Sequence, residues 1–470
     1  MRALLAFTGS RGDAQPGILL ARALRERGHD VTLALAPNLV ASAEDHRIPA
    51  VPFGCDTAEL LDAQRADHRF ADRDPRARLR ALFDLQRRGV PEQLADLRAL
   101  APGHDLVVAG MAGEEAAESV ARALGVPFAA VHFFPIQPND AVPVAPTRWA
   151  AALPGLVHRW GWSALTRARA AALAPVLPTM PRPPRTENAS ADTDAEVATA
   201  RIQAYDDRLF PGVRRQLPGP FTGFMIDVDG FLTEATGFAV RPPAGRHDEP
   251  EIAQSLATLD CSATTTTSDA PSPSSARRRS STTSLEAWLD AGTAPIYVGF
   301  GSMDVGDPAA FVAMVREVCA GRGRRLLLAS GWAAIAAGFE DAVAVVGQVD
   351  HARVLPRCVA AVHHGGAGTT AAALRAGVPQ VICSVQADQP YWGQALRRLG
   401  LAATIPAKKL TAERLDALLD QVARPDVIAR AASYAADFAT DGVERAADAV
   451  ESLLGSPIAP ELLRSAGRHL

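Results

Sequence analysis

The sequence is poor in lysine and has no long apolar run. Only two of its 48 basic residues are lysines, Lys408 and Lys409, and the formal net charge is −4. This near-neutral balance disfavours a dedicated nucleic-acid-binding protein, which usually carries a basic domain. No run of about 18 apolar residues occurs, so we expect no transmembrane helix. The first residues suit a buried strand better than a signal peptide.

Cysteine is also scarce, and no two cysteines form a CxxC pair. The five are widely spread: Cys55, Cys261, Cys319, Cys358 and Cys383. A disulfide framework and a cysteine-based zinc site are therefore both disfavoured, and the pattern is typical of a cytoplasmic protein.

Hydrophobic residues make up 48% of the 470 residues, enough for sizeable cores in two or three domains. The first half alternates apolar strands with helical segments, which is typical of a parallel, helix-covered sheet. We expect strands at 2–7, 31–36, 105–109 and 127–132, and helices from near Pro16 to before Gly28 and at 113–124.

A second alternating series begins near residue 285. We expect strands at 295–300, 325–329, 359–363 and 379–385, helices near 308–320 and 368–376, and amphipathic helices over 411–455. Between the two series, residues 262–284 hold 14 Ser or Thr in 23 positions and the run Arg277-Arg278-Arg279. This composition predicts a flexible linker. The expected divisions are 1–227, a linker over 228–284, 285–455, and a tail over 456–470.

The stretch from His363 to Thr370, HHGGAGTT, follows a buried strand and opens a helix. Unpaired N–H groups and the positive end of the helix dipole make such a turn an anion site, most naturally for phosphate. The motif Gly299-Phe300-Gly301-Ser302 ends a strand of the same predicted sheet. Carboxyl ends of parallel strands meet at one edge, so Gly301 and Ser302 could face the same phosphates.

The sequence lacks the motifs of two classes of phosphate-binding protein. The P-loop pattern GxxxxGK[ST] is absent, and the second strand ends at Ala34-Leu35-Ala36-Pro37 without the acid that NAD enzymes use. Asp388 and Gln389 follow the strand at 379–385, and a carboxylate beside an amide suits sugar hydroxyls. A phosphate site together with side chains that can bind sugar hydroxyls indicates a nucleotide-sugar ligand.

The segment from Val349 to Gln394, with HHGGAGTT and DQPYWGQ, resembles the donor signature of family-one nucleotide-sugar glycosyltransferases. It is similar to that of sterol 3-β-glucosyltransferases and bacterial glycopeptide and macrolide glycosyltransferases. PIYVGFGS at 295–302 and TGSRGDAQP at 8–16 match the same group. The resemblance implies the α/β fold called GT-B, in which two Rossmann-like domains face each other across a cleft. The N-terminal domain would bind the acceptor and the C-terminal domain the donor.

The resemblance also implies residue roles. The sugar would be held by Asp388 and Gln389, and the base would meet the backbone near Val349. The diphosphate would be held by Gly301, Ser302, His363, Gly366, Ala367, Gly368 and Thr369.

Asp13 is the expected general base, because transfer to a hydroxyl needs a base within hydrogen-bond reach. The relatives named above also carry Asp in an SRGD-like loop, and Ser10 and Arg11 would place donor or acceptor. The other interpretation of Asp13 is a helix-capping aspartate, and the two roles can coexist. The implied reaction is a single inverting displacement at the anomeric carbon. No metal or other cofactor is expected if His363 and the helix end supply the positive field.

Residues 147–174 contain Trp149, Trp160 and Trp162, together with four arginines and no acid. Three interpretations stay open: a helix lining an apolar acceptor pocket, a membrane-surface contact, or plain core. The expected acceptor is an apolar small molecule such as a sterol, polyketide or lipid, and the favoured donor is UDP-glucose rather than a dTDP-deoxysugar. The competing functions are a nucleotide-sugar epimerase and a non-catalytic auxiliary subunit of the same fold.

Overall fold

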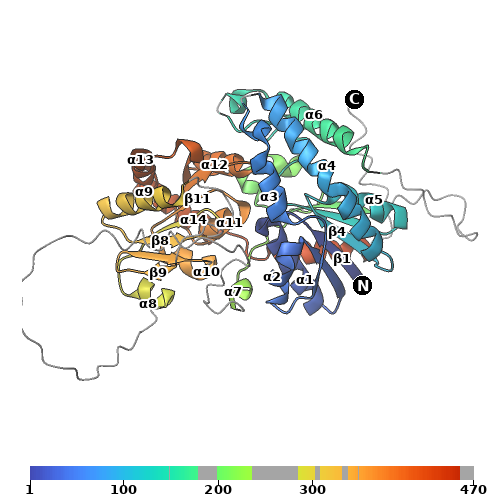
Figure 1. The fold of residues 1–470 in the computed structure, drawn as a ribbon, viewed down its shortest axis with the longest axis horizontal. Helices are drawn as coiled ribbons and strands as arrows, with labels where there is room; N and C mark the ends of the chain where they lie inside the picture. Colours follow the sequence, from blue (N-terminus) through green and yellow to red (C-terminus); the bar gives the residue numbers. More distant parts are fainter. Residues whose placement is uncertain are drawn as a thin grey trace, which may run out of the picture.

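The computed structural model describes residues 1–72, 74–147, 149–177, 198–234, 284–301, 307–330, 337–347 and 349–455. Its two α/β domains lie side by side, with the early part of the chain in one and residues after 284 in the other (Figure 1). Ser302 and the Ser/Thr-rich stretch up to residue 283 lie outside the described residues. The expected two-domain α/β architecture is confirmed.

The N-terminal domain contains a six-stranded, wholly parallel sheet in the order β3-β2-β1-β4-β5-β6. Its strands are β1 (Arg2–Phe7), β2 (Asp30–Leu35), β3 (Ala50–Pro52), β4 (Leu106–Gly110), β5 (Phe128–His132) and β6 (Thr199–Gln203). The helices are α1 (Arg11–Glu26), α2 (Val40–Glu44), α3 (Thr57–Ala66), α4 (Pro75–Leu100), α5 (Glu114–Leu124), α6 (Gly155–Leu173) and, after the sheet, α7 (Phe231–Glu234).

The C-terminal domain contains a seven-stranded sheet in the order β13-β12-β11-β7-β8-β10-β9, in which β9 is antiparallel to β10. Its strands are β7 (Ile296–Gly299), β8 (Leu326–Ala329), β9 (Gly338–Phe339), β10 (Val343–Val346), β11 (Ala360–His363), β12 (Gln380–Ser384) and β13 (Ala402–Pro406). The helices are α8 (Leu285–Asp290), α9 (Pro308–Gly321), α10 (His351–Val354), α11 (Ala367–Arg375), α12 (Gln389–Arg398), α13 (Ala412–Val422), α14 (Pro425–Ala436) and α15 (Gly442–Gly455).

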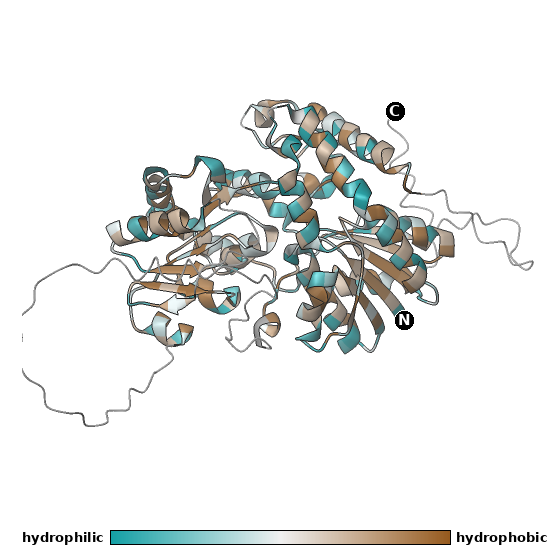
Figure 2. Ribbon diagram, viewed as in Figure 1, coloured by the Kyte–Doolittle hydropathy of each residue, from teal (hydrophilic) through white to brown (hydrophobic). Residues whose placement is uncertain are grey.

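The central strands are apolar along their whole length because helices cover both faces of each sheet. All residues of β4, β5, β7, β8, β11 and β12 are buried. Figure 2 shows these strands as the hydrophobic interior of each domain. Such sheets present their strand ends, and therefore their loops, at one edge, which is where ligands bind.

An aromatic cluster joins the two domains. Phe134 and Trp162 of the N-terminal half contact Tyr391 of α12, with ring centroids 5.1 and 6.2 Å away. Trp392, which is fully buried, lies 5.6 Å from Phe134 and 5.2 Å from Phe210. Helix α12 is therefore anchored in a core that both domains share.

Helix α15 packs against α1 of the N-terminal domain, although chain order groups residues 442–455 with the donor domain. Val443, Ala446, Ala447 and Val450 are buried in the same cluster as the α1 residues. Arg27, just past α1, is ion-paired with Asp448 at 2.7 Å. The red end of the chain accordingly lies among the blue elements in Figure 1.

Candidate active site

The loop after β1 holds Asp13 by a reciprocal cap at the start of α1. The Ser10 N–H and hydroxyl both donate to Asp13 Oδ2, at 2.8 and 3.0 Å, while Ser10 Oγ accepts from the Gly12 N–H. A Cβ atom at Gly9 would lie 2.5 Å from Asp13 Oδ2, and Gly9 has φ +118°, so this position requires glycine. The cap explains why α1 begins at Arg11 and not near Pro16.

Burial raises the pKa of Asp13 from its ordinary value of 3.8 to about 6, against the opposing hydrogen bonds from Ser10. The nearby charge of Asp388 raises it further. Asp388 belongs to the loop after β12, so the first loop of one domain meets the sugar loop of the other. A carboxylate with a pKa of about 6 is charged at neutral pH yet more basic than an ordinary aspartate.

Arg11 reaches toward the C-terminal domain. Burial lowers its pKa, and it interacts with Tyr297 of β7. The Tyr297 hydroxyl and His351 Nε2 lie 2.9 Å apart. Burial and the charge of Arg11 lower the pKa of His351 to about 4, so His351 is neutral at pH 7. Sequence reasoning did not find Tyr297 or His351, because nothing in their spacing links them to Arg11.

The end of β11 leads into the anion site expected from the HHGGAGTT motif. Gly366 is the N-cap of α11, and no described side chain caps this helix end. The N–H groups of Ala367, Gly368 and Thr369 therefore lack intrahelical acceptors. Gly368 is exposed, and a Cβ atom there would meet no described atom within 4 Å. The geometry fits a phosphate that contacts the backbone.

His363 does not face this anion site, which corrects the expected role of its ring. The side chain is fully buried; Nδ1 accepts from the Gly365 N–H at 3.1 Å, so the proton is on Nε2, which donates to Gln380 Oε1 at 2.9 Å. Burial lowers its pKa to about 3, so His363 supplies no positive charge. Its ring shapes the turn instead.

The neighbouring His364 lies against this turn: a Cβ atom at Gly366 would lie 2.5 Å from its Nε2, and burial lowers its pKa to about 4. Its Nδ1 atom is buried with no hydrogen-bond partner among the described residues. A Cβ atom at Gly301 would lie 3.4 Å from His364 Cε1, so the loops after β7 and β11 adjoin, as expected. Successive residues leave a strand end in opposite directions, and the sequence alone did not say which histidine faces the ligand.

Val349 is buried with the apolar side chains of this domain and directly precedes Asp350, the N-cap of α10. We expect the donor base to meet the backbone there.

Asp388 and Gln389 differ in how far they are already engaged. Asp388 Oδ2 accepts from the Trp392 indole N–H at 2.7 Å, and burial raises the Asp388 pKa. Gln389 is buried, and its Oε1 accepts from the N–H groups of Val385 and Gln386 at 2.8 and 3.0 Å. The Gln389 side-chain carbonyl thus stabilises its own loop, whereas the Asp388 carboxylate contributes to the raised pKa of Asp13.

The backbone just before Asp388 is strained. Ala387 has φ +54°, one of two described non-glycine residues with positive φ. This conformation costs roughly 1–2 kcal/mol for an L-residue. The surrounding loop maintains it through the Gln389 contacts, and strain of this kind clusters at ligand sites.

Residues of the N-terminal domain form hydrogen bonds with the loop after β12 and with the start of α12. Gln64 of α3 donates to Gln386 Oε1 at 2.6 Å, and the Tyr391 hydroxyl donates to the Val144 carbonyl at 2.8 Å. The two halves of the site are therefore in direct contact. A search of one sequence for motifs could not reveal these pairs, because their members are hundreds of positions apart.

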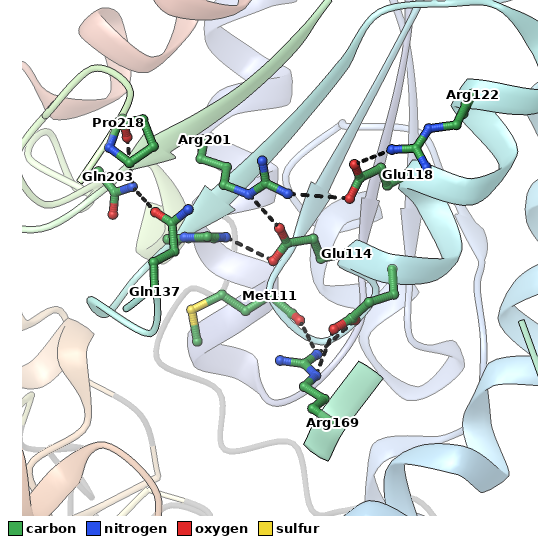
Figure 3. Close-up of polar contacts among 11 residues, drawn as sticks. Met111, Glu114, Glu118, Arg122, Gln137, Arg169, Arg201, Gln203 and Pro218 are labelled. Carbon is green, nitrogen blue, oxygen red and sulfur yellow. Dashed lines mark hydrogen bonds and ion pairs between the residues drawn. The ribbon is translucent and has the colours of Figure 1, made fainter. Parts of the chain in front are cut away.

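A buried ionic cluster lies at the carboxyl edge of the N-terminal sheet (Figure 3). Glu114 accepts from Arg201 at 3.1 Å and from His132, at the end of β5, at 2.9 Å. Burial would raise the pKa of Glu114, but His132, Arg201 and Arg169 outweigh it and hold it below its ordinary range. Arg169 of α6 also donates to the Met111 carbonyl at 3.1 Å. The cluster fixes the loop after β4 at this edge of the sheet.

The structure separates the three tryptophans that a single acceptor pocket would need. Trp162 is buried, and its indole N–H donates to the Val142 carbonyl at 2.8 Å, so it is a core residue. Trp149 and Trp160 are 68% and 70% exposed. Trp162 thus packs as a core residue, and a role in the acceptor pocket stays a prediction for all three tryptophans.

The chain is similar to known glycosyltransferases over almost its whole length. An uncharacterized glycosyltransferase of Mycobacterium tuberculosis is 33% identical over 451 residues, which cover 93% of this chain and 94% of the relative. Residues 3–95 match the glycosyltransferase family 28 N-terminal domain, and residues 333–445 match the erythromycin biosynthesis protein CIII-like C-terminal domain. The chain belongs to the family-one glycosyltransferases. This enzyme is of the bacterial glycopeptide and macrolide type and uses a nucleotide-sugar.

Further relatives agree with this assignment. The vancomycin aglycone glucosyltransferase of Amycolatopsis orientalis is 29% identical, covering 95% of this chain and 96% of the relative. The solved structure of the calicheamicin glycosyltransferase CalG4 superposes with a TM-score of 0.61 at 17% identity, over 98% and 99% of the two chains. The latter confirms the GT-B fold of this glycosyltransferase.

The described residues include neither a membrane-spanning helix nor a metal-binding cluster. None of the described helices of the glycosyltransferase is both long and apolar enough to cross a bilayer. No described group of three His, Cys, Asp or Glu side chains is placed to bind a metal ion.

Proposed function

We propose that this glycosyltransferase moves glucose from UDP-glucose to a hydroxyl of an apolar natural product, with inversion and with Asp13 as general base. The proposal rests above all on the proximity of Asp13 to Asp388, because it joins the expected base to the expected sugar site across the two domains. An acceptor hydroxyl between them would lose its proton to Asp13 while its oxygen attacks the anomeric carbon.

The leaving diphosphate carries the charge that develops as the glycosidic bond breaks. Backbone N–H groups of Gly366, Ala367, Gly368 and Thr369 would stabilise it, together with the α11 dipole. The buried, unpartnered Nδ1 of His364 and the guanidinium of Arg11 support additional contacts to this anion. Ser302 would complete the site.

The acceptor would enter along the carboxyl edge of the N-terminal sheet. Met111 packs partly buried against the apolar clusters there, beside Phe133 and Phe134, and the Glu114 cluster fixes its backbone. These apolar side chains suit a polyketide, sterol or lipid-like aglycone better than a polysaccharide. The vancomycin relative acts on an aglycone, by its name.

The proposal can be tested with a donor panel that includes UDP-glucose and dTDP-sugars, ranked by calorimetry. The preferred donor is then incubated with an acceptor panel, and products are identified by mass spectrometry and NMR of the anomeric proton. Transfer of glucose with inverted configuration supports the proposal. Preference for a dTDP-deoxysugar, or retention of configuration, would contradict the donor or the mechanism respectively.

A further inference from the structure

An exposed apolar surface lies at the N-terminal end of α6. Ten large hydrophobic side chains of the described residues are exposed, and four of these fall within twelve positions: Trp149, Leu156, Val157 and Trp160. We call these four residues the α6 apolar patch. Leu156 is 63% exposed, and the two tryptophans are more exposed still. Concentration of this kind marks an interaction site, whereas single exposed apolar residues are ordinary.

Three of the four patch residues, Leu156, Val157 and Trp160, lie on α6, and Trp149 precedes the helix. Leu156 and Trp160 lie one helical turn apart, and Arg167 continues the same face at its polar end. The opposite face, with His158, Trp162 and Leu173, is buried against the domain. Figure 1 places α6 along the outer edge of the N-terminal domain, and Figure 2 shows hydrophobic positions along it.

Arg159, between the patch residues, is ion-paired with Asp140 at 3.4 Å, so the unpaired positive charge near the patch comes chiefly from α4. No Asp or Glu occurs between residues 141 and 186. Helix α4 packs beside α6, with the Arg87 side chain donating to the Ala172 carbonyl at 2.9 Å. Leu82 of α4 is a fifth exposed hydrophobic residue. The same helix carries exposed arginines that form no ion pair with any described residue, namely Arg76, Arg78, Arg80 and Arg88.

We propose that the α6 apolar patch and the α4 arginines dock this enzyme on an anionic lipid bilayer. Exposed tryptophans prefer the boundary between headgroups and acyl chains, and unpaired arginines are attracted to anionic headgroups. This combination fits a bilayer better than a protein partner, since the cations have no fixed geometry to match. The contact is peripheral and needs neither donor nor acceptor, so it stands apart from the proposed function.

Vesicle co-sedimentation of the full chain tests the docking directly, without substrates. We expect binding to phosphatidylcholine vesicles that contain phosphatidylglycerol, and much weaker binding to phosphatidylcholine alone. The double variant Trp149→Ser/Trp160→Ser should weaken binding about tenfold or more, since both anchoring side chains are lost. The triple variant Arg76→Gln/Arg80→Gln/Arg88→Gln should weaken it and flatten its salt dependence.

Ile428→Ser is the matched control, because Ile428 is an exposed hydrophobic residue of α14 in the other domain (45% exposed). It should bind vesicles like the parent. Equal binding to neutral and anionic vesicles, or no loss in the tryptophan variant, would overturn the proposal. So would a concentration-dependent dimer that the tryptophan variant abolishes, since the patch would then cover a second copy. Circular dichroism shows whether each variant is folded.

Discussion

At the scale of single residues, two effects compete at Asp13. The α1 N-terminus and the Ser10 hydrogen bonds favour its charged form, whereas burial disfavours it. The sequence placed Asp13 at a helix start but did not show how far it is buried. Burial is the larger effect, so the folded protein holds Asp13 at a pKa of about 6. The ionised Asp13 therefore lowers the stability of the fold at neutral pH, while its raised pKa makes it a stronger base.

This cost predicts that Asp13→Asn stabilises the fold at neutral pH. Because the folded pKa exceeds the ordinary 3.8, ionisation of Asp13 destabilises the protein as pH rises from about 4 to above 6. The asparagine variant, which keeps the acceptor for the Ser10 N–H, should gain about 2–3 kcal/mol at pH 7.5. Denaturant titrations at pH 7.5 and 4 check this, and the gain should vanish at pH 4.

Ser10→Ala is the control for that experiment. It removes the hydroxyl that donates to Asp13 and caps α1, so it should destabilise the protein by about 1 kcal/mol at both pH values. A stability gain from Asp13→Asn that persists unchanged at pH 4 would show that burial does not raise the pKa of this carboxyl.

Substitution of His363 and of His364 should affect different properties, the first stability and the second diphosphate affinity. His363→Ala leaves the Gly365 N–H and Gln380 Oε1 without their buried partner, so the free energy of unfolding should fall by about 2–4 kcal/mol. His364→Ala should leave stability nearly unchanged and weaken nucleoside diphosphate binding about tenfold. Chemical denaturation and calorimetry separate the two effects. Equal loss of diphosphate affinity in both variants would contradict this division.

At the scale of elements, the alternating apolar pattern predicted most strands to within one or two residues. The reason is physical: a parallel strand buried on both faces is a continuous apolar run, bounded by glycines such as Gly125, whose φ is +71°. The loops after β1, β7, β11 and β12 were therefore placed at the correct edges. The direction of individual side chains could not be predicted. The sequence did not show, for example, whether His363 or His364 lies toward the expected phosphate site.

The strained turn before α12 gives a prediction at this scale. A β-branched residue tolerates positive φ poorly, so Ala387→Val should destabilise the protein by about 1–2 kcal/mol and displace Asp388, lowering affinity for the nucleotide-sugar. Ala387→Gly, which adopts the same φ without strain, should do neither. Calorimetry with the nucleotide-sugar and with the free nucleoside diphosphate measures the split. Should both variants bind the nucleotide-sugar like the parent, this turn does not position Asp388.

At the scale of the whole molecule, the contacts between the domains are the hardest to predict from a single sequence. The pairs Gln64–Gln386 and Tyr391–Val144 and the packing of α15 on α1 all join distant positions. No local period or motif encodes them, whereas the resemblance of three short motifs was enough to identify the fold. The proposed active site depends on these contacts, because its two carboxylates, Asp13 and Asp388, come from different domains.

We propose that Asp13 takes the proton of the acceptor hydroxyl where the two domains meet. The most direct measurement is kcat of Asp13→Asn beside its affinity for the nucleoside diphosphate, once a donor and an acceptor are known. A general base typically contributes about 10²–10⁴-fold, so kcat should fall by that factor while diphosphate affinity stays within about twofold. Turnover within threefold of the parent enzyme would contradict the account.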